Sequence, residues 1–473
     1  MPRFCLLLIA FACGCSADPP ADQSADLSAG LPTESEPRNE VLFWHFWGGR
    51  DRPVVDEIVR RFNASQSTHR VRAVAMPGAN LDLKFFLSVA GGDPPDLLNQ
   101  DDPIVADWAH RGALVPLDEM ATDEELVRLT EWLFPAARQL GEYDGRLYAL
   151  ANGLDLRALY INKTLLDERG LSLPETTDDL DRLAVAIAPP AAGRLDRVGY
   201  LPDARRLWAW GIVFGGRFYD PAAIDPADAI TADSPPVLAA LRWMAEPSRR
   251  YGPDRVAAFR TGDQGLTGAA FPLLADRRYA AIMDGQWRVR DLVEAEETAR
   301  RRGEPFDEIV VTPLPAPPGG RERAGWVNGN FFVVPRGGKN PAGAWEFMKF
   351  WSGFDGNEPA AAEACVAGGW VPASQHVVDQ PAFEAFLAER PRFRTFVELA
   401  ASENQHPTPP LPVAPLYVRE VNAAVQDVLY RGAEPAARLK QAADRVRQRL
   451  RETMPVGVIP VGAGGRRGAK QDG

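Results

Sequence analysis

The chain has few of the side chains on which catalysis, metal binding and disulfide bonding usually depend. Its 473 residues include only four cysteines and five histidines, and no two histidines have the helical spacing of a metal-binding pair. The G-x-G-x-x-G, Walker, G-x-S-x-G and H-E-x-x-H motifs are all absent. We therefore expect no bound metal and no cofactor, and the sequence contains no recognisable catalytic motif.

Positive charge and long apolar runs are also scarce. The formal net charge is −11, which argues against a nucleic-acid-binding surface or a polybasic contact with a membrane. Beyond the N-terminus, no segment reaches the length of about 18 consecutive apolar residues that a membrane-spanning helix requires. Hydrophobic residues make up 45% of the chain, as in ordinary globular proteins, and 473 residues are too many for one core. We therefore expect two lobes.

The N-terminus is typical of an export signal followed by a linker. Arg3 precedes a short apolar run, residues 4–13, and small residues lead to Cys15. This pattern predicts a signal peptide over residues 1–14, because the run is too short to span a bilayer. It also predicts lipidation of Cys15. Residues 15–40 are polar and without periodicity, which predicts a flexible tether between the lipid and the globular protein.

Alternatives to this interpretation are a plain secretory signal or a buried apolar strand, and Cys13 competes with Cys15 as the lipidated residue. Cleavage before Cys15 removes Cys5 and Cys13 and leaves Cys365 alone. No disulfide is then expected. Cys365 lies in an alanine-rich helical stretch and is interpreted as a small buried hydrophobic residue.

Apolar runs and helical periodicities alternate along the rest of the chain. Residues 41–46 form a nearly continuous apolar run, which is typical of a strand covered on both faces. Asp51 is expected to cap a helix in which apolar residues recur on one face: Val54, Val55, Ile58, Val59 and Phe62. This alternation predicts an α/β class with mainly parallel sheets flanked by helices. A Gly- and Arg-rich tail, residues 455–473, is expected to be disordered.

Tryptophan is abundant near predicted turns. The chain has 12 tryptophans, and several lie beside Gly, Asp or Asn. A flat indole covers the apolar face of a pyranose, while carboxylates and amides bind its hydroxyls, so this pattern favours carbohydrate binding. The alternative is that each tryptophan belongs to the core. The candidates are Trp44, Trp47, Trp208, Trp210, Trp287, Trp326 and Trp370.

Several short segments occur in an order that resembles one protein family. They are residues 43–49 (FWHFWGG), 84–96 (KFFLSVAGGDPPD), 108–118, 143–150 (YDGRLYAL), 158–163 (ALYINK), 281–287 (AIMDGQW) and 368–373 (GGWVPA). Together with the lipoprotein-like start, they resemble the extracellular solute-binding proteins of sugar ABC transporters, of the family 1 type.

The resemblance implies a periplasmic-binding-protein fold, in which two α/β lobes enclose a ligand cleft and the chain crosses between them about three times. We place the crossings near residues 151–154, 318–325 and 367–369. The N-lobe would comprise residues 41–152 plus 325–367, and the C-lobe residues 153–324 plus 368–454. Whether residues 313–320 form a hinge or a surface loop stays open.

The resemblance also implies a set of cleft residues. Strand ends would supply Trp47 and Gly48, then Gln100, Asp101 and Asp102. Asp155 would bind sugar hydroxyls, and Trp287 and Trp370 would be stacking platforms. Composition alone adds Trp208, Trp210 and Asn328. One residue departs from the family pattern, because Ile161 stands where the family usually has a tyrosine.

These features predict a non-catalytic receptor that captures a sugar or oligosaccharide and delivers it to the transmembrane subunits of an ABC permease. We expect a monomer, lipid-anchored at the periplasmic or extracellular face of the membrane. One alternative is a lipid-anchored enzyme acting on glycans, with two of Asp101, Asp102, Asp155 and Asp284 as acid and base. Another is a receptor for a glycerol phosphodiester or other polyol.

Three arginines bear on the last alternative. Arg157, Arg205 and Arg206 are expected near the cleft, where guanidinium groups could bind a phosphate or carboxylate. The competing interpretation is that they are solvated surface residues.

Overall fold

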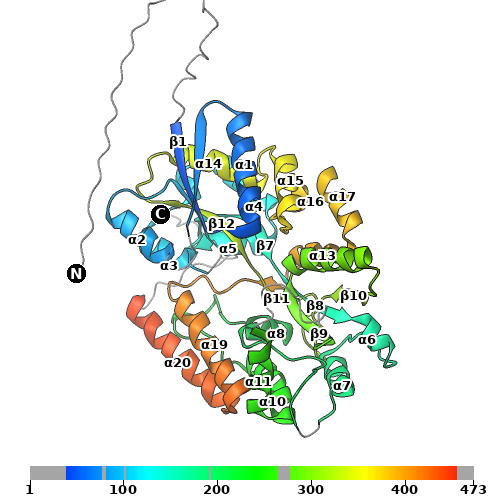
Figure 1. Ribbon diagram of the computed structural model, residues 1–473. Coiled ribbons are helices and arrows are strands. Elements are labelled where there is room, and N and C mark those ends of the chain that lie inside the picture. The colour runs from blue at the N-terminus through cyan, green and yellow to red at the C-terminus, as the bar shows by residue number, and fades with distance from the viewer. Residues whose placement is uncertain (1–38, 77–80, 101–102, 191–192, 265–276, 455–473) are drawn as a thin grey trace, which may run out of the picture. The chain divides into compact units, whose positions relative to one another are not determined.

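The computed structural model describes residues 39–76, 81–100, 103–190, 193–264 and 277–454 (Figure 1). The predicted signal peptide, residues 15–38 of the predicted tether and the predicted tail lie outside these residues, as do Asp101 and Asp102. The predicted end of the tether is two residues too late, because Asn39 and Glu40 already belong to strand β1 (Asn39–His45).

A mixed sheet of six strands forms the centre of the N-lobe. The strand order is β2 (His69–Ala75), β1 (Asn39–His45), β3 (Leu97–Gln100), β12 (Asn328–Pro335) and β4 (Leu114–Val115), and β7 (Ala149–Asp155) also pairs with β12. β1 is parallel to β2 and β3, whereas β12 is antiparallel to β3, β4 and β7.

Helices cover this sheet because their apolar faces pack on it. In α1 (Arg52–Ser65) the buried residues include Ile58 and Phe62, which confirms the predicted helical face. Phe43 of β1 packs edge-to-face against Phe347 of α14, with ring centroids 5.5 Å apart. The helices of this lobe are α1, α2 (Leu81–Ala90), α3 (Val105–His110), α4 (Asp123–Trp132), α5 (Pro135–Gly141), α14 (Pro341–Ser352) and α15 (Glu358–Gly368).

A three-stranded sheet forms the centre of the C-lobe. β8 (Arg157–Asn162) lies between β10 (Ile309–Thr312) and β9 (Ala281–Gly285), and both pairings are antiparallel. The prediction of a mainly parallel sheet in each lobe is therefore wrong for this lobe, and in the N-lobe sheet three of the five strand pairings are antiparallel as well. Buried strands give the same apolar runs in either orientation, so periodicity could not distinguish the two arrangements.

The C-lobe helices bury a second core that includes Ile161 of β8 and Tyr417 of α19. Thr176 and Asp179 form a capping box at the start of α7. The helices are α6 (Lys163–Asp167), α7 (Thr177–Ile187), α8 (Leu207–Val213), α9 (Pro235–Met244), α10 (Glu246–Tyr251), α11 (Pro253–Gln264), α13 (Trp287–Arg302), α19 (Ala414–Arg431) and α20 (Pro435–Thr453).

Shorter elements complete the described chain. Helix α17 packs on α15 of the N-lobe, and α18 packs on β8 of the C-lobe, so the segment after α15 contacts both lobes. The predicted assignment of residues 368–454 to the C-lobe therefore does not describe α17. The other lobe boundaries stay a prediction. The short elements are α16 (Gln375–Val378), α17 (Pro381–Glu389), α18 (Arg394–Ala400), β5 (Glu142–Tyr143), β6 (Arg146–Leu147), β11 (Gly325–Trp326), β13 (Gln405–His406) and the 3-10 turns η1 (Gly49–Asp51), η2 (Leu117–Glu119), η3 (Ala204–Arg206) and η4 (Pro391–Phe393).

The lobes are joined where β7 leads into β8 (Figure 1). β7 pairs with the start of β12 up to this point, with Asp155 opposite Asn328 and Gly153 opposite Asn330. Leu154 forms a bridge with Val371, which follows α15. Segments near the predicted crossings at 151–154 and 367–369 thus meet, and the positions of the crossings stay a prediction.

Candidate functional site

Polar and aromatic side chains gather where β7, β8, β9 and β12 end or begin. Asp155 is the last residue of β7 and pairs with Asn328, the first residue of β12. Arg157 opens β8 and pairs with Gly285, the last residue of β9. Residues that are far apart in the sequence therefore meet at the junction of the lobes.

A glutamine amide ties this junction together. The Gln286 Nε2 atom donates a 2.7 Å hydrogen bond to Asp155 Oδ1, and its Oε1 accepts a 3.2 Å bond from the Leu156 N–H. Arg157 Nη2 donates to Asn328 Oδ1 at 3.2 Å. Burial raises the pKa of Asp155, against the opposing effect of the Arg157 charge. The Gln286 hydrogen bond holds Asp155 in place without a direct ion pair. A carboxyl group held in this way can accept a hydrogen bond from a ligand hydroxyl or, when protonated, donate one to it.

Two indoles flank Arg157. Its Cζ atom lies 4.6 Å from the ring centroid of Trp287 and 5.6 Å from that of Trp326. The Trp287 ring also folds back over Gly285, where a Cβ would lie only 2.3 Å from the ring. The structure therefore brings the predicted Asp155, Trp287 and Asn328 together and adds Trp326 to them.

A second aromatic group lies beside the third crossing. The rings of Trp47 and Trp351 stack with centroids 5.2 Å apart, and those of Trp351 and Trp370 stack at 5.9 Å. Trp370 folds over Gly368 as Trp287 does over Gly285. The predicted Trp47 and Trp370 are largely buried, and Trp351 was not among the candidates.

Gly48 and Gln100 differ in their surroundings. Gly48 follows Trp47 and is exposed, with nothing near the position of a Cβ. Gln100 is buried at the end of β3 and donates to Asp82 Oδ1 at 3.2 Å. Its predicted neighbours Asp101 and Asp102 lie outside the described residues.

Trp208 and Trp210 are core residues in this structure. Their exposed fractions are 1% and 0%, because α8 is buried on all sides. Trp208 packs against Phe218 and Tyr417, with ring centroids 4.2 and 5.1 Å away, and Trp210 Nε1 donates to the Tyr200 hydroxyl at 3.0 Å. Neither indole is open to a ligand in this conformation, so the structure favours the alternative that these two belong to the core.

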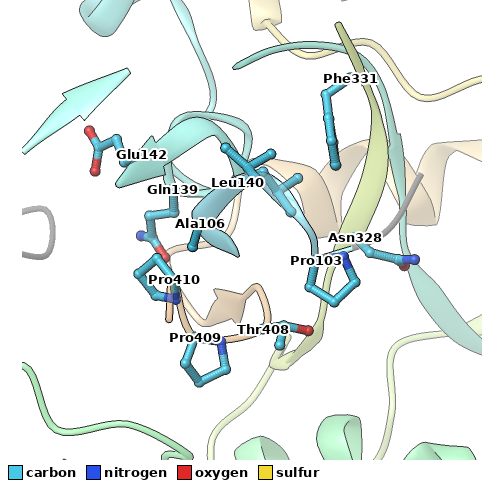
Figure 2. A pocket seen from close by; sticks show the side chains of 11 residues that line it. Pro103, Ala106, Gln139, Leu140, Glu142, Asn328, Phe331, Thr408, Pro409 and Pro410 are labelled. Atoms are coloured by element: carbon cyan, nitrogen blue, oxygen red, sulfur yellow. The ribbon is translucent and has the colours of Figure 1, made fainter. Parts of the chain in front are cut away.

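Two pockets adjoin the junction and were not anticipated. Figure 2 shows the smaller, of about 20 Å³, with Asn328 and Pro103 on one side and Gln139 and Pro410 on the other. The larger has about 280 Å³ and shares Gln139, Glu142, Pro409 and Pro410 with the smaller. Its other lining residues come from both lobes: Tyr143, Asp144, Ile212, Arg217, Phe218, Tyr219, Pro221, His406 and Pro407.

The larger pocket combines aromatic rings with hydrogen-bonding groups. Burial raises the pKa of Glu142 and raises that of Tyr219 to about 12. Burial, with the charges of Arg321 and Arg217, lowers the pKa of His406 to about 4. Phenol, carboxyl and neutral imidazole groups suit a ligand rich in hydroxyls. Of these residues, only Tyr143 and Asp144 had a signal in the sequence, since they lie in a segment of the family resemblance.

Ion pairs join the lobes beside Trp287. Arg50 of η1 pairs with Asp291 at 2.8 Å and Glu294 at 3.0 Å, and Arg290 pairs with Asp51 at 3.2 Å. Asp51 is the N-cap residue of α1, as predicted, but its side chain makes no cap hydrogen bond and contacts Arg290 instead. α13 thus carries the candidate platform at its start and the interlobe contacts in its next turns.

Within the described residues, no group of three or more His, Cys, Asp or Glu side chains is arranged to hold a metal ion. No described helix has the length and apolar character needed to cross a membrane.

Comparisons with known proteins bear on this architecture. The sequence profile of the bacterial extracellular solute-binding proteins matches residues 57–391. The maltotriose-binding protein of Pyrococcus abyssi is 22% identical over 350 residues, which are 72% of this chain and 68% of that protein. A probable sugar-binding periplasmic protein of Rhizobium meliloti is 29% identical over 194 residues, covering 39% of this chain and 45% of that one.

Solved structures share the fold. CpMnBP1 with mannotriose bound superposes with a TM-score of 0.69 at 22% identity, covering 86% of this chain and 100% of that chain. The cyclic alpha-maltosyl-1,6-maltose binding protein of Arthrobacter globiformis gives a TM-score of 0.68 at 20% identity, covering 88% and 100%. The two-lobe fold is the one these proteins have, and the profile covers most of the sequence, so the chain belongs to the family of bacterial extracellular solute-binding proteins.

Proposed function

We propose that this chain is the substrate-binding component of an ABC importer, and that it captures a sugar or oligosaccharide between its lobes. The observation that carries the proposal is the junction site, where Asp155, fixed by Gln286, lies beside the half-buried indole of Trp287. A carboxyl group and an aromatic face are the two elements that pyranose recognition needs. Relatives named for maltotriose binding and for sugar binding support the ligand class.

The role we propose is binding without catalysis. The two described carboxylates of the enzyme alternative are engaged elsewhere: Asp284 pairs with Arg288 at 2.9 Å, and Asp155 accepts from Gln286. The ion pair occupies the Asp284 carboxylate, which disfavours a role for it as acid or base. Incubation with oligosaccharides should therefore release no shorter products.

Thermal unfolding with a saccharide panel tests the binding role. A ligand that binds only the native state increases the free energy of unfolding by mass action, by about 2.7 kcal/mol at a hundredfold excess over Kd, and so raises the melting temperature. We expect at least one mono- or oligosaccharide to raise it. A well-folded protein that shows no shift with any member of the panel would contradict the proposal.

Variants then test the site. Trp287→Ala and Asp155→Asn should each remove the ligand-induced shift, because they remove the stacking face and the hydroxyl-binding carboxylate. Asp196→Asn is the matched control, since the Asp196 side chain is 72% exposed and lies away from the junction in sequence and contacts. Normal binding by both site variants would place the site elsewhere, with the larger pocket as the next candidate.

We further propose that Cys15 is lipidated and tethers the protein at the periplasmic or extracellular face, near the permease subunits. The support is the signal-like N-terminus together with the extracellular nature of the family. Mass spectrometry of the mature N-terminus should find diacylated Cys15. An N-terminus that begins elsewhere without lipid would contradict this.

A further inference from the structure

Two buried arginines at the junction have no carboxylate partner among the described residues. Arg157 and Arg206 are only 6% and 8% exposed, which excludes the solvated-surface interpretation for both. Arg205, the third arginine of that hypothesis, is 66% exposed at its side chain and pairs with Asp203. Burying a guanidinium group costs several kcal/mol unless it is paired. The charges of Asp155, Asp203 and Asp284 act on these two arginines, but no described carboxylate forms a direct ion pair with either of them.

The neighbouring carboxylates are committed to other groups. Asp203 bonds to Arg205, Asp284 to Arg288, and Asp155 to the Gln286 amide. The described contacts of Arg157 are two 3.2 Å hydrogen bonds, to the Leu156 carbonyl and to Asn328.

The two guanidinium groups also retain unsatisfied donors. The Nε atoms of Arg157 and Arg206 are both buried without a hydrogen-bond partner, and the Arg206 side chain forms no hydrogen bond within the part of the chain that the structure describes. The two charges act on each other, since burial and then the Arg206 charge lower the pKa of Arg157 to about 9. The charges of Asp155 and Asp284 oppose this lowering, and the Arg157 guanidinium stays protonated at neutral pH.

Aromatic rings surround this positive charge. The rings of Trp287 and Trp326 contact the Arg157 guanidinium, so flat apolar surfaces lie next to its positive charge. A sugar ring that carries an anion would match both features, with the ring near an indole and the anion on the guanidinium groups.

We propose that the saccharide bound here carries an anionic group, a carboxylate or a phosphate ester, which binds to Arg157 and Arg206. This rests on the function proposed above and narrows its substrate class to acidic sugars. The anion supplies the direct ion pairs that the two arginines lack among the described residues.

Isothermal titration of the purified full-length chain with matched pairs of ligands tests the proposal. The carboxylate arm uses di- and trisaccharides of mannuronic, guluronic and galacturonic acid, each beside its carboxyl-reduced neutral form. The phosphate arm uses hexose 6-phosphates and a glycerol phosphodiester, beside the free hexose and glycerol. We expect the acidic member of at least one pair to bind tenfold or more tightly than its neutral form, and the responding arm identifies the anion.

Arg206→Gln provides the site-specific readout. It should weaken binding of the acidic ligand tenfold or more, whereas Arg206→Lys should keep part of the affinity. The control is Arg182→Gln, at a side chain 72% exposed on α7, which should leave binding unchanged. Without ligand, Arg206→Gln should unfold at the same or a higher temperature, because it removes an uncompensated buried charge.

The outcomes separate the two proposals. Neutral forms that bind as tightly as their acidic partners, or acid binding that Arg206→Gln leaves intact, would overturn the anionic ligand while the saccharide receptor stands. A melting temperature of ligand-free Arg206→Gln that is several degrees lower would also overturn the anionic ligand, because it would show that the Arg206 charge already has a stabilising partner in the protein. Binding by neither member of any pair would overturn the anionic ligand, and the thermal-shift panel of saccharides would then decide the proposed function by itself.

Discussion

The substitution Gly285→Ala tests how the Trp287 indole is positioned. An alanine Cβ at this position would lie 2.3 Å from Cη2 and Cζ3 of the ring and 2.6 Å from Cε3, whereas ordinary contacts begin at 3.4 Å. The indole must therefore move by about 1 Å or the strand end must shift, and the Arg157 guanidinium on the ring must move with it. Overpacking of this kind costs about 1–3 kcal/mol.

Ligand affinity should fall together with stability. An aromatic stacking contact contributes about 0.5–1.5 kcal/mol, so a displaced ring should weaken binding by roughly two- to tenfold. Urea denaturation measures the stability loss. Titration calorimetry measures the ligand affinity. The ligand is the saccharide that gives the largest rise in the melting temperature of the unmodified chain.

Gly262→Ala is the matched control. Gly262 is an exposed helical residue of α11, and a Cβ there would come no closer than 3.6 Å to Arg278. Removing a helical glycine should stabilise the chain by about 0.5–1 kcal/mol and leave binding unchanged. If Gly285→Ala keeps both its stability and its affinity, then the glycine does not hold the ring and the reasoning is refuted.

Three further predictions follow from the described contacts. Arg50→Gln removes the half-exposed ion pairs to Asp291 and Glu294, which should contribute about 0.2–1 kcal/mol each. Stopped-flow measurements should find that this variant releases ligand faster than the unmodified chain at low salt and at the same rate at high salt, where the ion pairs are screened. Burial lowers the pKa of His45 to about 4 in the folded chain. Between pH 6.5 and pH 4 the unfolded chain therefore binds a proton at His45 that the folded chain does not bind, and the free energy of unfolding falls as the pH drops through this range. His45→Phe should abolish that part of the pH dependence, up to about 3 kcal/mol by urea denaturation, and parallel profiles for both chains would contradict it. Trp208→Ala should lower the free energy of unfolding by about 3–5 kcal/mol, because the side chain is buried. Trp208→Phe should leave ligand affinity unchanged. A stable Trp208→Phe variant that binds ligand more weakly would show that Trp208 belongs to the binding site.

Local patterns predicted the elements of the N-lobe well. The spacing of Val55, Ile58, Val59 and Phe62 is helical, and all four are buried on α1. The resemblance to a known family placed Asp155 and Trp287 together, although they are far apart in the sequence. The helix prediction succeeded because it depended on a short segment whose pattern is set by one helix face.

Other features depend on packing that no short segment encodes. Trp208 and Trp210 have the same composition around them as a stacking platform, but α8 is buried all round. Gln139 and Tyr219 line one pocket from different lobes, which only the folded chain brings together. The antiparallel order of β10, β8 and β9 depends on which strands pair, and their apolar runs do not specify it.

The pairing of β7 with β12 has a mechanical consequence. Both strands pass through the junction as one hydrogen-bonded ribbon, with Gly329 opposite Leu154 and Asn330 opposite Gly153, and the register shifts once, between Asn330 and Phe331. Paired strands resist sliding and twisting independently, whereas a ribbon bends at an irregularity in its register. We therefore expect the lobes to rotate about a single axis near this point. The protein would then have one conformational coordinate, and a single distance between labels on the two lobes would report its whole range of motion.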